Sequence, residues 1–539
     1  MLTNYVFVTG GVLSGLGKGI TLASIGKVLQ SKGFRVTAIK IDPYINLDAG
    51  TLRPTEHGEV WVTDDGGEID QDLGHYERFL DTNISKEHNN TTGQVYQVVI
   101  EKERKGEYLG KTVEVIPHIP DEIKRRIKDV AKKTKADFVF IEIGGVVGDY
   151  QNVLFLEAAR EMKLEGENVV FVHVGYLPIP EYLGEMKSKP MQHSVKELRT
   201  IGIQPDIIIC RSDYPVDEIR KDKIALFCNV KKEDIISNPN LENVYELPLI
   251  FEEQRLGDKI LKKLNLKPRK NDLKEWKRFI EKIKKIKKVV KIGIVGKYFD
   301  IGKYRLPDSY ISVIEAIKHA AWHNNVKPEV KWIDSKIFEK DPKKISMLKE
   351  FDGIIVPGGF GYSGIEGKIA AIRYVREHKI PYLGLCLGMQ LAVVEFARNV
   401  CRMKEANSTE FNTKTNYPVI DFIPEQAKLI RESRYGATMR LGAYPAILKR
   451  GSLIRKLYGK DEVWERHRHR YEVNPKYVDI LEKKGLVFSG RSPDCILMEF
   501  MELPNHLFIA TQAHPEFKSR PMKPSPMFDG LIKACIKNK

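Results

Sequence analysis

The chain has 539 residues, of which 42% are hydrophobic and 30% charged, and its 88 basic and 72 acidic residues give a net charge of +16. This balance is ordinary for a globular protein and leaves room for two to four domains of roughly 100–200 residues. No apolar run reaches the roughly 20 residues of a membrane-spanning helix, and the first residues lack the basic and apolar segments of a secretory signal. We therefore expect no membrane partner and a cytoplasmic location.

The charge and the cysteines exclude further classes of protein. Much of the basic excess lies between residues 259 and 291, and no zinc-finger spacing, aromatic RNA-binding signature or basic zipper accompanies it. We interpret it as a lysine-rich surface and expect no nucleic-acid partner, although net charge alone keeps that hypothesis open. The six cysteines form no CxxC pair, which argues against a disulfide framework and a structural zinc site.

Apolar strands alternate with helices along the first half of the chain. We predict strands at 6–9, 35–41, 137–143, 168–174 and 206–210, and helices at 18–32 and 123–133. Apolar strands that alternate with helices are typical of a parallel sheet covered on both faces. The first half is therefore predicted to be a P-loop-like α/β domain over residues 1–267.

A basic segment interrupts this alternation. Beyond Pro268, apolar residues that include Leu273, Trp276 and Ile280 recur at helical spacing, which predicts an amphipathic linker helix within 268–290. A second alternating unit follows it. Its predicted strands are 289–295, 353–356 and 381–385, and its predicted helices are 308–323 and 367–378. We expect a second α/β domain over residues 291–539.

A glycine-rich loop follows the first predicted strand. Residues 10–20 read GGVLSGLGKGI and lead into a helix, so backbone N–H groups, the helix N-terminus and Lys18 can surround a phosphate. The loop is not a standard Walker A motif, because it has one residue too many between Gly11 and Gly17 and because Gly19 replaces the hydroxyl residue that binds Mg²⁺. The alternative is a plain glycine-rich turn. We predict ATP binding by Gly15, Leu16, Gly17, Lys18, Gly19 and Ile20.

The missing hydroxyl means that a metal would need other oxygen donors. The strand at 137–143 carries Glu142 near its carboxyl end, where ligands gather in open parallel sheets. The acidic loop 64–72 supplies further carboxylates. Mg²⁺ takes a few carboxylates together with phosphate oxygens and water, so these acids are candidate ligands.

The second half contains a turn that can present a nucleophile. Residues 381–390 read PYLGLCLGMQ, so that Cys386 lies between a strand and a helix, with a glycine two residues away on either side. This Gly-x-Cys-x-Gly turn is the thiol version of a nucleophile elbow. A helix N-terminus and an adjacent histidine favour the reactive thiolate. We therefore predict that Cys386 is a catalytic nucleophile and not an inert core thiol.

The base is predicted near the end of the chain. In the segment AHPEF at 513–517, the proline favours an extended backbone at His514, and alternate residues of an extended chain point the same way. Glu516 can then orient the imidazole of His514, which activates Cys386. Backbone N–H groups at Gly359 and Leu387 can form an oxyanion hole.

The combination of a Pro-Gly-Gly turn, the cysteine elbow and His-Pro-Glu resembles the class I (triad) glutamine amidotransferases. The resemblance implies that Cys386 attacks the side-chain amide of glutamine, forms a glutamyl thioester and releases ammonia. A source of ammonia joined to an ATP site predicts ATP-dependent amination of an oxygen-bearing carbon. This reasoning does not identify the acceptor.

Longer motifs resemble the CTP synthase family along nearly the whole chain. They are 11–20, 40–46, 57–60, 72–79 and 187–195 in the first half, and 406–411, 438–442 and 466–474 in the second. The resemblance implies that ATP phosphorylates O4 of UTP and that ammonia displaces the phosphate to give CTP. It also implies a homotetramer with nucleotide sites between subunits, CTP as a feedback inhibitor and GTP as an allosteric activator of glutamine hydrolysis.

The same resemblance implies roles for individual residues. Lys18, Lys40, Asp72 and Glu142 would handle the phosphates with Mg²⁺, with Asp72 and Glu142 as its ligands, and Arg211 would lie near ATP. UTP or CTP would be held by Ser14, Asp149, Tyr150, Gln151, Lys187, Ser188, Lys189, Gln192 and Lys223. Glutamine would be bound by Gly359, Phe360, Gln390, Glu410 and Arg470.

Three segments depart from the family pattern, namely 147–152, 187–192 and 360–364. Gln151 replaces a glutamate and Met191 replaces a threonine, changes that bear on pyrimidine-nucleotide contacts and CTP feedback. In the lid segment 360–364, Ser363 replaces an arginine. We therefore expect GTP to have only a weak effect on this protein.

Two other functions stay open. A cobyrinate-type amidotransferase also joins a P-loop-like domain to a class I glutaminase, but the motifs at 42–46 and 187–195 favour amination of UTP. An inactive, filament-forming nucleotide sensor is the second alternative. The retained Cys386, His514 and Glu516 argue against it.

Overall fold

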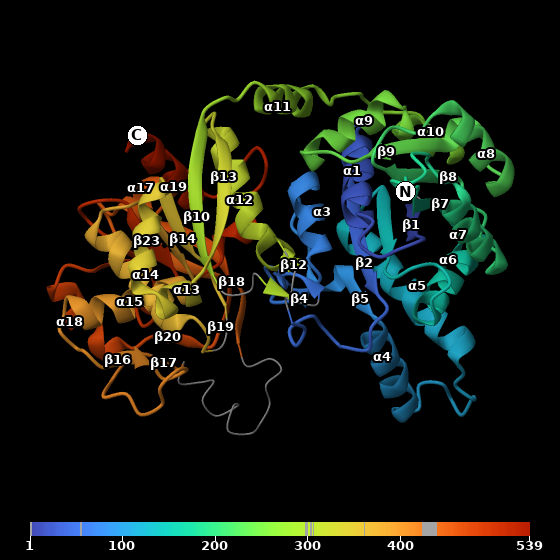
Figure 1. Ribbon diagram of the computed structural model, residues 1–539. Helices are drawn as coiled ribbons and strands as arrows, with labels where there is room; N and C mark the ends of the chain where they lie inside the picture. Colours follow the sequence, from blue (N-terminus) through green and yellow to red (C-terminus); the bar gives the residue numbers. More distant parts are fainter. Residues whose placement is uncertain are drawn as a thin grey trace. The chain divides into compact units, whose positions relative to one another are not determined.

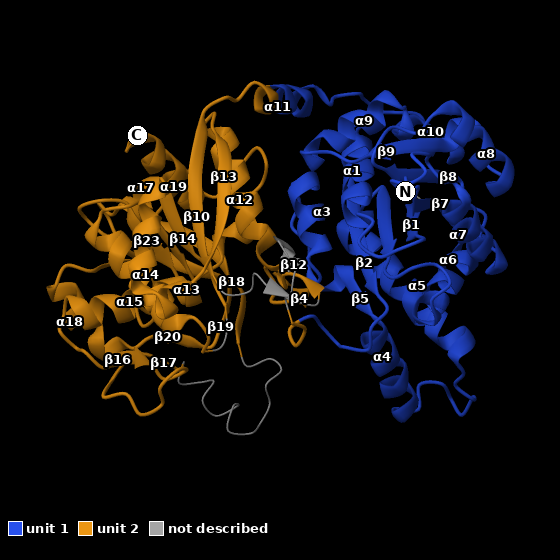
Figure 2. Ribbon diagram, in the orientation of Figure 1, with its two compact units in different colours: residues 1–49, 70–281 blue, residues 50–69, 282–539 orange. Residues whose placement is uncertain are grey.

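The computed structural model describes residues 3–53, 57–296, 300–301, 304–305, 307–359, 362–422 and 439–538. The chain forms two compact units, one of Met1–Ala49 with Asp70–Glu281 and the other of Gly50–Ile69 with Lys282–Lys539 (Figure 2). The units differ from the predicted domains in two respects. The segment Gly50–Ile69 groups with the second unit, and the boundary between Glu281 and Lys282 falls inside the predicted linker. Among the described residues, no helix is both long and apolar enough to span a lipid bilayer.

The first unit is built on a seven-stranded sheet with the order β5-β2-β6-β1-β7-β8-β9 (Figure 1). All its neighbouring strands are parallel, as the alternation of strands and helices predicts. The central strands are buried from end to end, because both faces of the sheet carry apolar side chains. The strands are β1 Asn4–Gly10, β2 Val36–Asp42, β5 Asn89–Thr91, β6 Phe138–Ile143, β7 Asn168–Tyr176, β8 Ile207–Ser212 and β9 Ile235–Pro239.

Helices pack on this sheet. Alternate side chains of β1, including Tyr5 and Phe7, share one hydrophobic core with α4, α5 and α6. The predicted helix at 123–133 is longer than expected and begins at Val115. The helices of this unit are α1 Lys18–Ser31, α3 Asp72–Leu80, α4 Thr92–Arg104, α5 Val115–Thr134, α6 Val153–Leu164, α7 Lys189–Thr200, α8 Glu218–Cys228, α9 Leu247–Glu253 and α10 Leu256–Lys263.

The predicted linker helix is present as α11 Lys274–Lys284. Its apolar stripe is buried at Trp276 and Ile280, and its lysines lie on the other faces. The Trp276 indole N–H donates a hydrogen bond of 2.8 Å to the carbonyl of Tyr245. The helix is thus fixed by its apolar side, which is why so basic a segment is ordered.

The second unit contains a nine-stranded sheet with the order β13-β10-β14-β15-β23-β22-β21-β18-β19. From β13 to β23 neighbouring strands are parallel, and from β23 to β19 they are antiparallel. The antiparallel part was not predicted, because its half-polar strands lack a continuous apolar run. The strands are β10 Val289–Gly296, β13 Lys327–Asp334, β14 Gly353–Val356, β15 Tyr382–Leu385, β18 Arg440–Leu448, β19 Glu462–His469, β21 Val487–Arg491, β22 Met498–Leu503 and β23 Phe508–Thr511.

Smaller elements complete the second unit. A hairpin of β3 Trp61–Val62 and β4 Glu68–Ile69 lies in its first segment, and short strands β11 Asp300–Ile301 and β12 Tyr304–Arg305 pair with each other. A three-stranded sheet contains β16 Ala406–Ser408, β17 Tyr417–Phe422 and β20 Tyr471–Val473. The helices are α12 Ile311–His323, α13 Lys336–Lys340, α14 Ile365–Glu377, α15 Leu387–Asn399, α17 Leu453–Tyr458, α18 Pro475–Lys483 and α19 Pro526–Lys537.

Candidate functional site

The glycine-rich loop joins β1 to α1 in the first unit. Gly15 and Gly17 have φ values of 71° and 76°, and a Cβ on either would meet nothing within 4 Å. Glycine is therefore needed there for the left-handed backbone and not for packing. The loop opens at the N-terminus of α1, where unpaired N–H groups favour an anion. Burial lowers the pKa of Lys18, whose Nζ donates to the carbonyl of Gly145 at 2.9 Å.

The structure explains why Gly19 stands where a hydroxyl residue is usual. A Cβ on Gly19 would lie 2.5 Å from Oδ1 of Asp72, so the Asp72 carboxylate fills the space of the missing side chain. Asp72 begins α3 and reaches the first turn of α1 from there. A carboxylate oxygen from another element of the same unit thus lies beside the position where the loop lacks a hydroxyl side chain.

Lys40 gathers the acidic groups behind the loop. Its buried ammonium contacts Asp72, lies 2.8 Å from Oε1 of Glu142 and lies 3.9 Å from Oδ1 of Asp70. Tyr76 donates a hydrogen bond to the other oxygen of Glu142. From the acidic loop 64–72, only Asp70 and Asp72 join this cluster, whereas Asp64 and Glu68 pair with arginines of the second unit.

The charges in this cluster control one another. Burial would raise the pKa of Asp72, but Lys40, His75 and Lys18 together outweigh burial and lower it to about 2. Burial dominates at Asp70 and raises its pKa to about 8. Burial would likewise lower the pKa of Lys40, but the carboxylates of Asp72 and Glu142 hold it well above its ordinary value. Lys40 and Asp72 therefore stay charged at neutral pH.

The carboxylates fit a magnesium ion in part. Asp72 and Glu142 meet at Lys40, close to the loop, and supply the hard oxygen donors that Mg²⁺ prefers. Within the described ranges, no group of three or more His, Cys, Asp or Glu side chains is placed to hold a metal by itself. Mg²⁺ would therefore need phosphate oxygens and water as further ligands, which is usual for nucleotide-bound magnesium.

Most of the predicted pyrimidine-nucleotide residues lie on α7, α8 and the segments before them. Lys187 and Lys223 both lower the pKa of Glu185, and Lys187 binds its carboxylate at 2.8 Å. On α7, Gln192 donates to the hydroxyl of Ser188 at 3.1 Å. Lys189 is exposed, with its ammonium 5.8 Å from the centre of the Phe227 ring.

The other predicted nucleotide residues belong to separate loops. Ser14 is exposed on the phosphate loop, and Tyr150 and Gln151 are exposed beyond β6. The Asp149 carboxylate accepts the N–H of Val146 at 3.0 Å and shapes that loop. Arg211 lies one residue before the end of β8 and donates to carbonyl and side-chain oxygens of residues 238–240.

Met191 is a packing residue in this structure. Its side chain is fully buried, and a Cβ on Gly175 would lie 2.6 Å from its terminal methyl group. It belongs to the apolar core beneath α7 together with Leu177 and Val195. The methionine that stands in place of the threonine of the family pattern is therefore a buried core residue and not an exposed one.

In the second unit, Cys386 forms the whole turn between β15 and α15. Its backbone has φ 51° and ψ −104°, a region that side-chain-bearing residues rarely adopt. A Cβ on Gly388 would lie 2.1 Å from the carbonyl oxygen of Val356, and one on Gly384 would meet Ala510 at 2.9 Å. Both glycines of the predicted elbow are therefore required by close packing, and the strained turn holds the thiol in one place.

The three predicted catalytic side chains lie together. Nδ1 of His514 lies 2.7 Å from Oε1 of Glu516. Burial would lower the pKa of His514, but the charges of Glu516 and Cys386 raise it to about 10. The imidazole therefore carries two protons at neutral pH. The local backbone differs from the prediction, because Pro515 starts a 3-10 helix at Pro515–Lys518 and Glu516 reaches His514 from this tight turn instead of from an extended segment.

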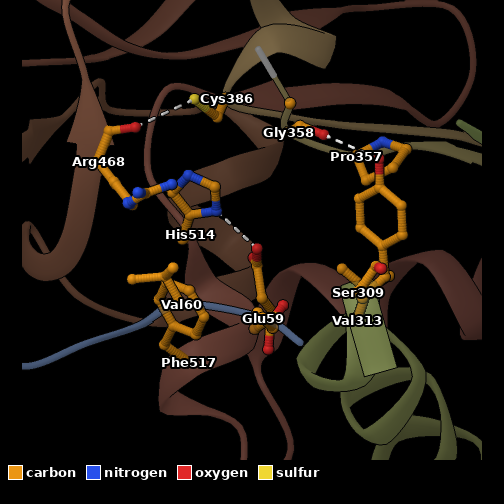
Figure 3. A pocket seen from close by; sticks show the side chains of 13 residues that line it. Glu59, Val60, Ser309, Val313, Pro357, Gly358, Cys386, Arg468, His514 and Phe517 are labelled. Carbon is orange, nitrogen blue, oxygen red and sulfur yellow. Dashed lines mark hydrogen bonds and ion pairs between the residues drawn. The ribbon is translucent and has the colours of Figure 1, made fainter. Parts of the chain in front are cut away.

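A pocket with a cavity volume of about 70 Å³ opens beside these side chains (Figure 3). The sulfur of Cys386 lies 3.8 Å from the carbonyl oxygen of Arg468, and the Tyr310 hydroxyl donates to the carbonyl of Gly358 at 3.4 Å. The lining residues are Glu59, Val60, Ser309, Tyr310, Val313, Pro357, Gly358, Gly359, Cys386, Arg468, His514, Glu516 and Phe517.

The residues predicted for the oxyanion hole, Gly359 and Leu387, and those predicted to bind glutamine fall in two groups. Gly359 lines the pocket, and Leu387 is buried directly after Cys386. The others, Gln390, Glu410 and Arg470, lie near Tyr471. Gln390 donates to the Tyr471 carbonyl at 2.9 Å. Burial and the charge of Glu410 raise the pKa of the Tyr471 hydroxyl, and the charge of Arg470 opposes this rise. Phe360 lies outside the described residues.

Several residues near the nucleophile were not predicted from the sequence. Gln512 places its side-chain nitrogen 3.7 Å from the sulfur of Cys386, and its position two residues before His514 was the available signal. Glu59 and Val60 line the pocket although they precede the second half of the chain by more than 200 residues. The sequence held no local signal for them, because only the fold brings the segment Gly50–Ile69 to this unit.

Known proteins resemble the chain along its full length. The family model for the CTP synthase N-terminus matches residues 4–266, and that for class I glutamine amidotransferases matches residues 305–534. The CTP synthase of Pyrococcus abyssi is 56% identical over 538 residues, which cover 99% of this chain and 98% of that protein. The CTP synthase of Methanocaldococcus jannaschii is 54% identical over 546 residues, which cover 100% of this chain and 99% of that protein. The chain therefore belongs to the CTP synthase family.

Proposed function

We propose that this protein makes CTP from UTP in the cytoplasm, with ATP as phosphate donor and glutamine as the source of ammonia. The observation that carries the proposal is the presence of two candidate sites in one chain of this family. The second unit holds Cys386, His514 and Glu516 around a pocket, and the first holds a phosphate loop backed by Lys40 and its carboxylates.

Ammonia is produced in the second unit. The sulfur of Cys386 attacks the side-chain amide carbon of glutamine, and the oxyanion accepts hydrogen bonds from the N–H groups of Gly359 and Leu387. Doubly protonated His514 gives a proton to the departing nitrogen, which leaves as ammonia and a glutamyl thioester. The imidazole then takes a proton from water, which attacks the thioester and releases glutamate. Glu516 keeps the ring in place throughout.

The rest of the glutamine molecule needs charged partners. Glu410 suits its ammonium group and Arg470 suits its carboxylate, because the two oppose these charges and both lie near Tyr471. Gln390 and Phe360 complete the proposed glutamine site. The buried side chain of Gln390 is fixed by the carbonyl of Tyr471, so we assign it an orienting role.

Phosphoryl transfer takes place in the first unit. The backbone of residues 15–20 and the ammonium of Lys18 hold the phosphates of ATP, and Lys40 balances the charge of Asp72 and Glu142. Asp72 and Glu142 would hold Mg²⁺, which would supply positive charge that stabilises the phosphates. The γ-phosphate passes to O4 of UTP, and ammonia replaces it at C4. Arg211 lies near ATP in this proposal.

The basic residues Lys187, Lys189 and Lys223 suit the triphosphate of UTP, and of CTP as feedback inhibitor. Ser14, Ser188 and Gln192 add neutral hydrogen-bonding groups, and the loop Asp149–Gln151 adds the exposed aromatic ring of Tyr150. We propose that these residues form nucleotide sites between the subunits of a homotetramer. GTP acts weakly as an allosteric activator, because Ser363 offers no positive charge in the lid segment.

One assay tests this function. Purified protein is incubated with UTP, ATP, Mg²⁺ and glutamine, and CTP is measured by chromatography, with a control that lacks ATP. We expect CTP only when ATP is present. If glutamate is released but no CTP forms with either glutamine or ammonium as nitrogen source, the glutaminase activity is supported and UTP as acceptor is contradicted. That result would favour a cobyrinate-type reaction. Absence of both activities would favour a nucleotide sensor.

A further inference from the structure

The hairpin Trp61–Ile69 is part of the glutaminase unit although its neighbours in sequence are not. Residues up to Ala49 and from Asp70 belong to the first unit, whereas Gly50–Ile69 belongs to the second. Strands β3 and β4 pair in antiparallel fashion, and Thr63 closes the turn by accepting the N–H of Gly67 on its hydroxyl at 2.8 Å. The hairpin therefore has a defined shape of its own.

Arginines of β19 hold this hairpin from one side. Arg466 donates to Oδ1 of Asp64 at 2.6 Å, and Arg468 donates to Oε1 of Glu68 at 2.7 Å. These arginines are two residues apart on a strand, so both face the hairpin. The N–H of Ala443 on β18 adds a hydrogen bond of 2.9 Å to the carbonyl of Asp64. Three contacts thus fix the hairpin on the edge of the nine-stranded sheet.

The side chain of Trp61 touches both supports of the catalytic base. The ring of His514 stacks on Phe517, with 5.3 Å between centroids, and the ring of Phe517 packs on Trp61 at 4.9 Å. The backbone N–H of His514 donates to the carbonyl of Arg466 at 2.7 Å, and the guanidinium of Arg466 lies over the Trp61 ring at 5.4 Å. The indole is completely buried among these groups.

We propose that Trp61 is a positioning residue for His514, acting through Phe517 and Arg466. The inference rests on the proposed glutaminase function. Trp61 is not among the residues that line the pocket, so it acts on the geometry of the base and not on bound glutamine. Without the indole, the ring of Phe517 loses its support and the imidazole moves relative to Cys386. Displacements of about 1 Å in a catalytic group cost up to about 100-fold in rate.

The test compares two reactions of the same full-length protein. Glutamine hydrolysis is followed as glutamate release with UTP, ATP and Mg²⁺ present, and CTP formation is followed with ammonium chloride as nitrogen source. For Trp61→Ala we expect kcat for hydrolysis to fall about 10- to 100-fold. The KM for glutamine and the ammonium-driven rate should each stay within about twofold to threefold, because Trp61 touches neither substrate nor the phosphate loop.

Two further variants separate positioning from general destabilisation. Trp61→Phe keeps an aromatic support and should restore kcat to within about threefold of the wild type. Trp61→Leu keeps apolar bulk without a ring, and it replaces the alanine variant if that protein is insoluble. Trp322→Ala removes another buried tryptophan of the same unit, one that packs on His319, and should not lower hydrolysis selectively.

Each outcome decides between the proposals. Three results would overturn the role of Trp61. They are a wild-type rate of hydrolysis in Trp61→Ala and Trp61→Leu, an equal loss of both reactions, and an equally selective loss of hydrolysis in Trp322→Ala. If the wild-type protein releases glutamate but forms no CTP from ammonium, the proposed function fails instead. The role of Trp61 is then still decided by glutamate release alone.

Discussion

Two strand–turn–helix motifs of this molecule share the same local topology but use their glycines differently. Between β1 and α1 the turn is a long loop whose glycines supply left-handed backbone, and open space surrounds Gly15 and Gly17. Between β15 and α15 the turn is Cys386 alone, and its glycines are required because other atoms fill the space of their side chains. The first turn makes room for an anion, whereas the second fixes one sulfur atom. Glycine serves backbone freedom in one place and close packing in the other.

The largest expected effect comes from removing the sulfur. Cys386→Ala should lower glutamine-driven CTP formation by about 10³-fold or more, because hydrolysis then has no nucleophile. Ammonium-driven CTP formation should stay within about twofold, since the phosphate loop belongs to the other unit. The two rates are measured in parallel by chromatography of CTP. A variant that still uses glutamine would show that another group attacks the amide.

The packing role of Gly388 is tested by adding a single methyl group. Gly388→Ala places a Cβ 2.1 Å from the carbonyl oxygen of Val356, so the elbow must shift. We expect destabilisation of about 2–3 kcal/mol and a large loss of glutamine hydrolysis. Thermal unfolding and glutamate release measure the two effects.

Gly15→Ala is the matched control for this substitution. Alanine there meets no neighbouring atom and costs only the strain of a left-handed backbone, about 1 kcal/mol. Glutamine hydrolysis should be unchanged in this variant. If both substitutions lower the free energy of unfolding by the same amount and lower the rate of glutamine hydrolysis equally, the distinction between the two turns is wrong.

Gly19 is an exception to this comparison, because it belongs to the phosphate-binding segment but is required by packing. In Gly19→Ala the added methyl displaces the carboxylate of Asp72, which lies 2.5 Å from the Cβ position. We expect CTP formation from either nitrogen source to fall about tenfold, the typical effect of a displaced supporting group around a metal site. Glutamate release should be retained. A variant with wild-type CTP formation would exclude Asp72 from the phosphate site.

The smallest expected effect is a shift in pH dependence. The pKa of His514 is raised to about 10, so any stability that its protonation provides is complete below about 6.5 and is lost as pH rises through about 10. Glutamine hydrolysis should decline over the upper part of this window, because neutral His514 cannot protonate the departing nitrogen. In Glu516→Gln the declining limb should move to lower pH, since the charge of Glu516 is the first cause that raises this pKa.

Glutamate release measured from pH 6 to 10.5 checks this prediction. Glu516→Gln has nearly the same shape as the native side chain, so a lower rate at all pH values without a shifted limb would indicate only a misplaced ring. An unshifted limb would contradict Glu516 as the electrostatic partner of His514.

Sequence patterns identified candidate site residues where residues that are close in the chain are also close in space. Cys386 sits in its elbow because the flanking glycines are two residues away, and Lys18 follows its loop directly. His514 and Glu516 were paired correctly, but the predicted extended backbone is a 3-10 turn, since Pro515 is well placed in the first turn of a helix. The antiparallel strands β18 to β22 were missed because their alternating polar residues resemble surface loops.

The sequence by itself determined the fold class, the order of the two halves and the family, and it predicted the nucleophile with its base. These follow from short-range rules, namely alternation of apolar segments, glycine at tight turns and contiguous motifs. Only the tertiary structure decided that Asp72 fills the space beside Gly19, that Lys40 balances the buried acids, and that the hairpin Trp61–Ile69 supports His514. Those relations join residues tens to hundreds of positions apart, and packing and charge compensation in the folded chain bring them together.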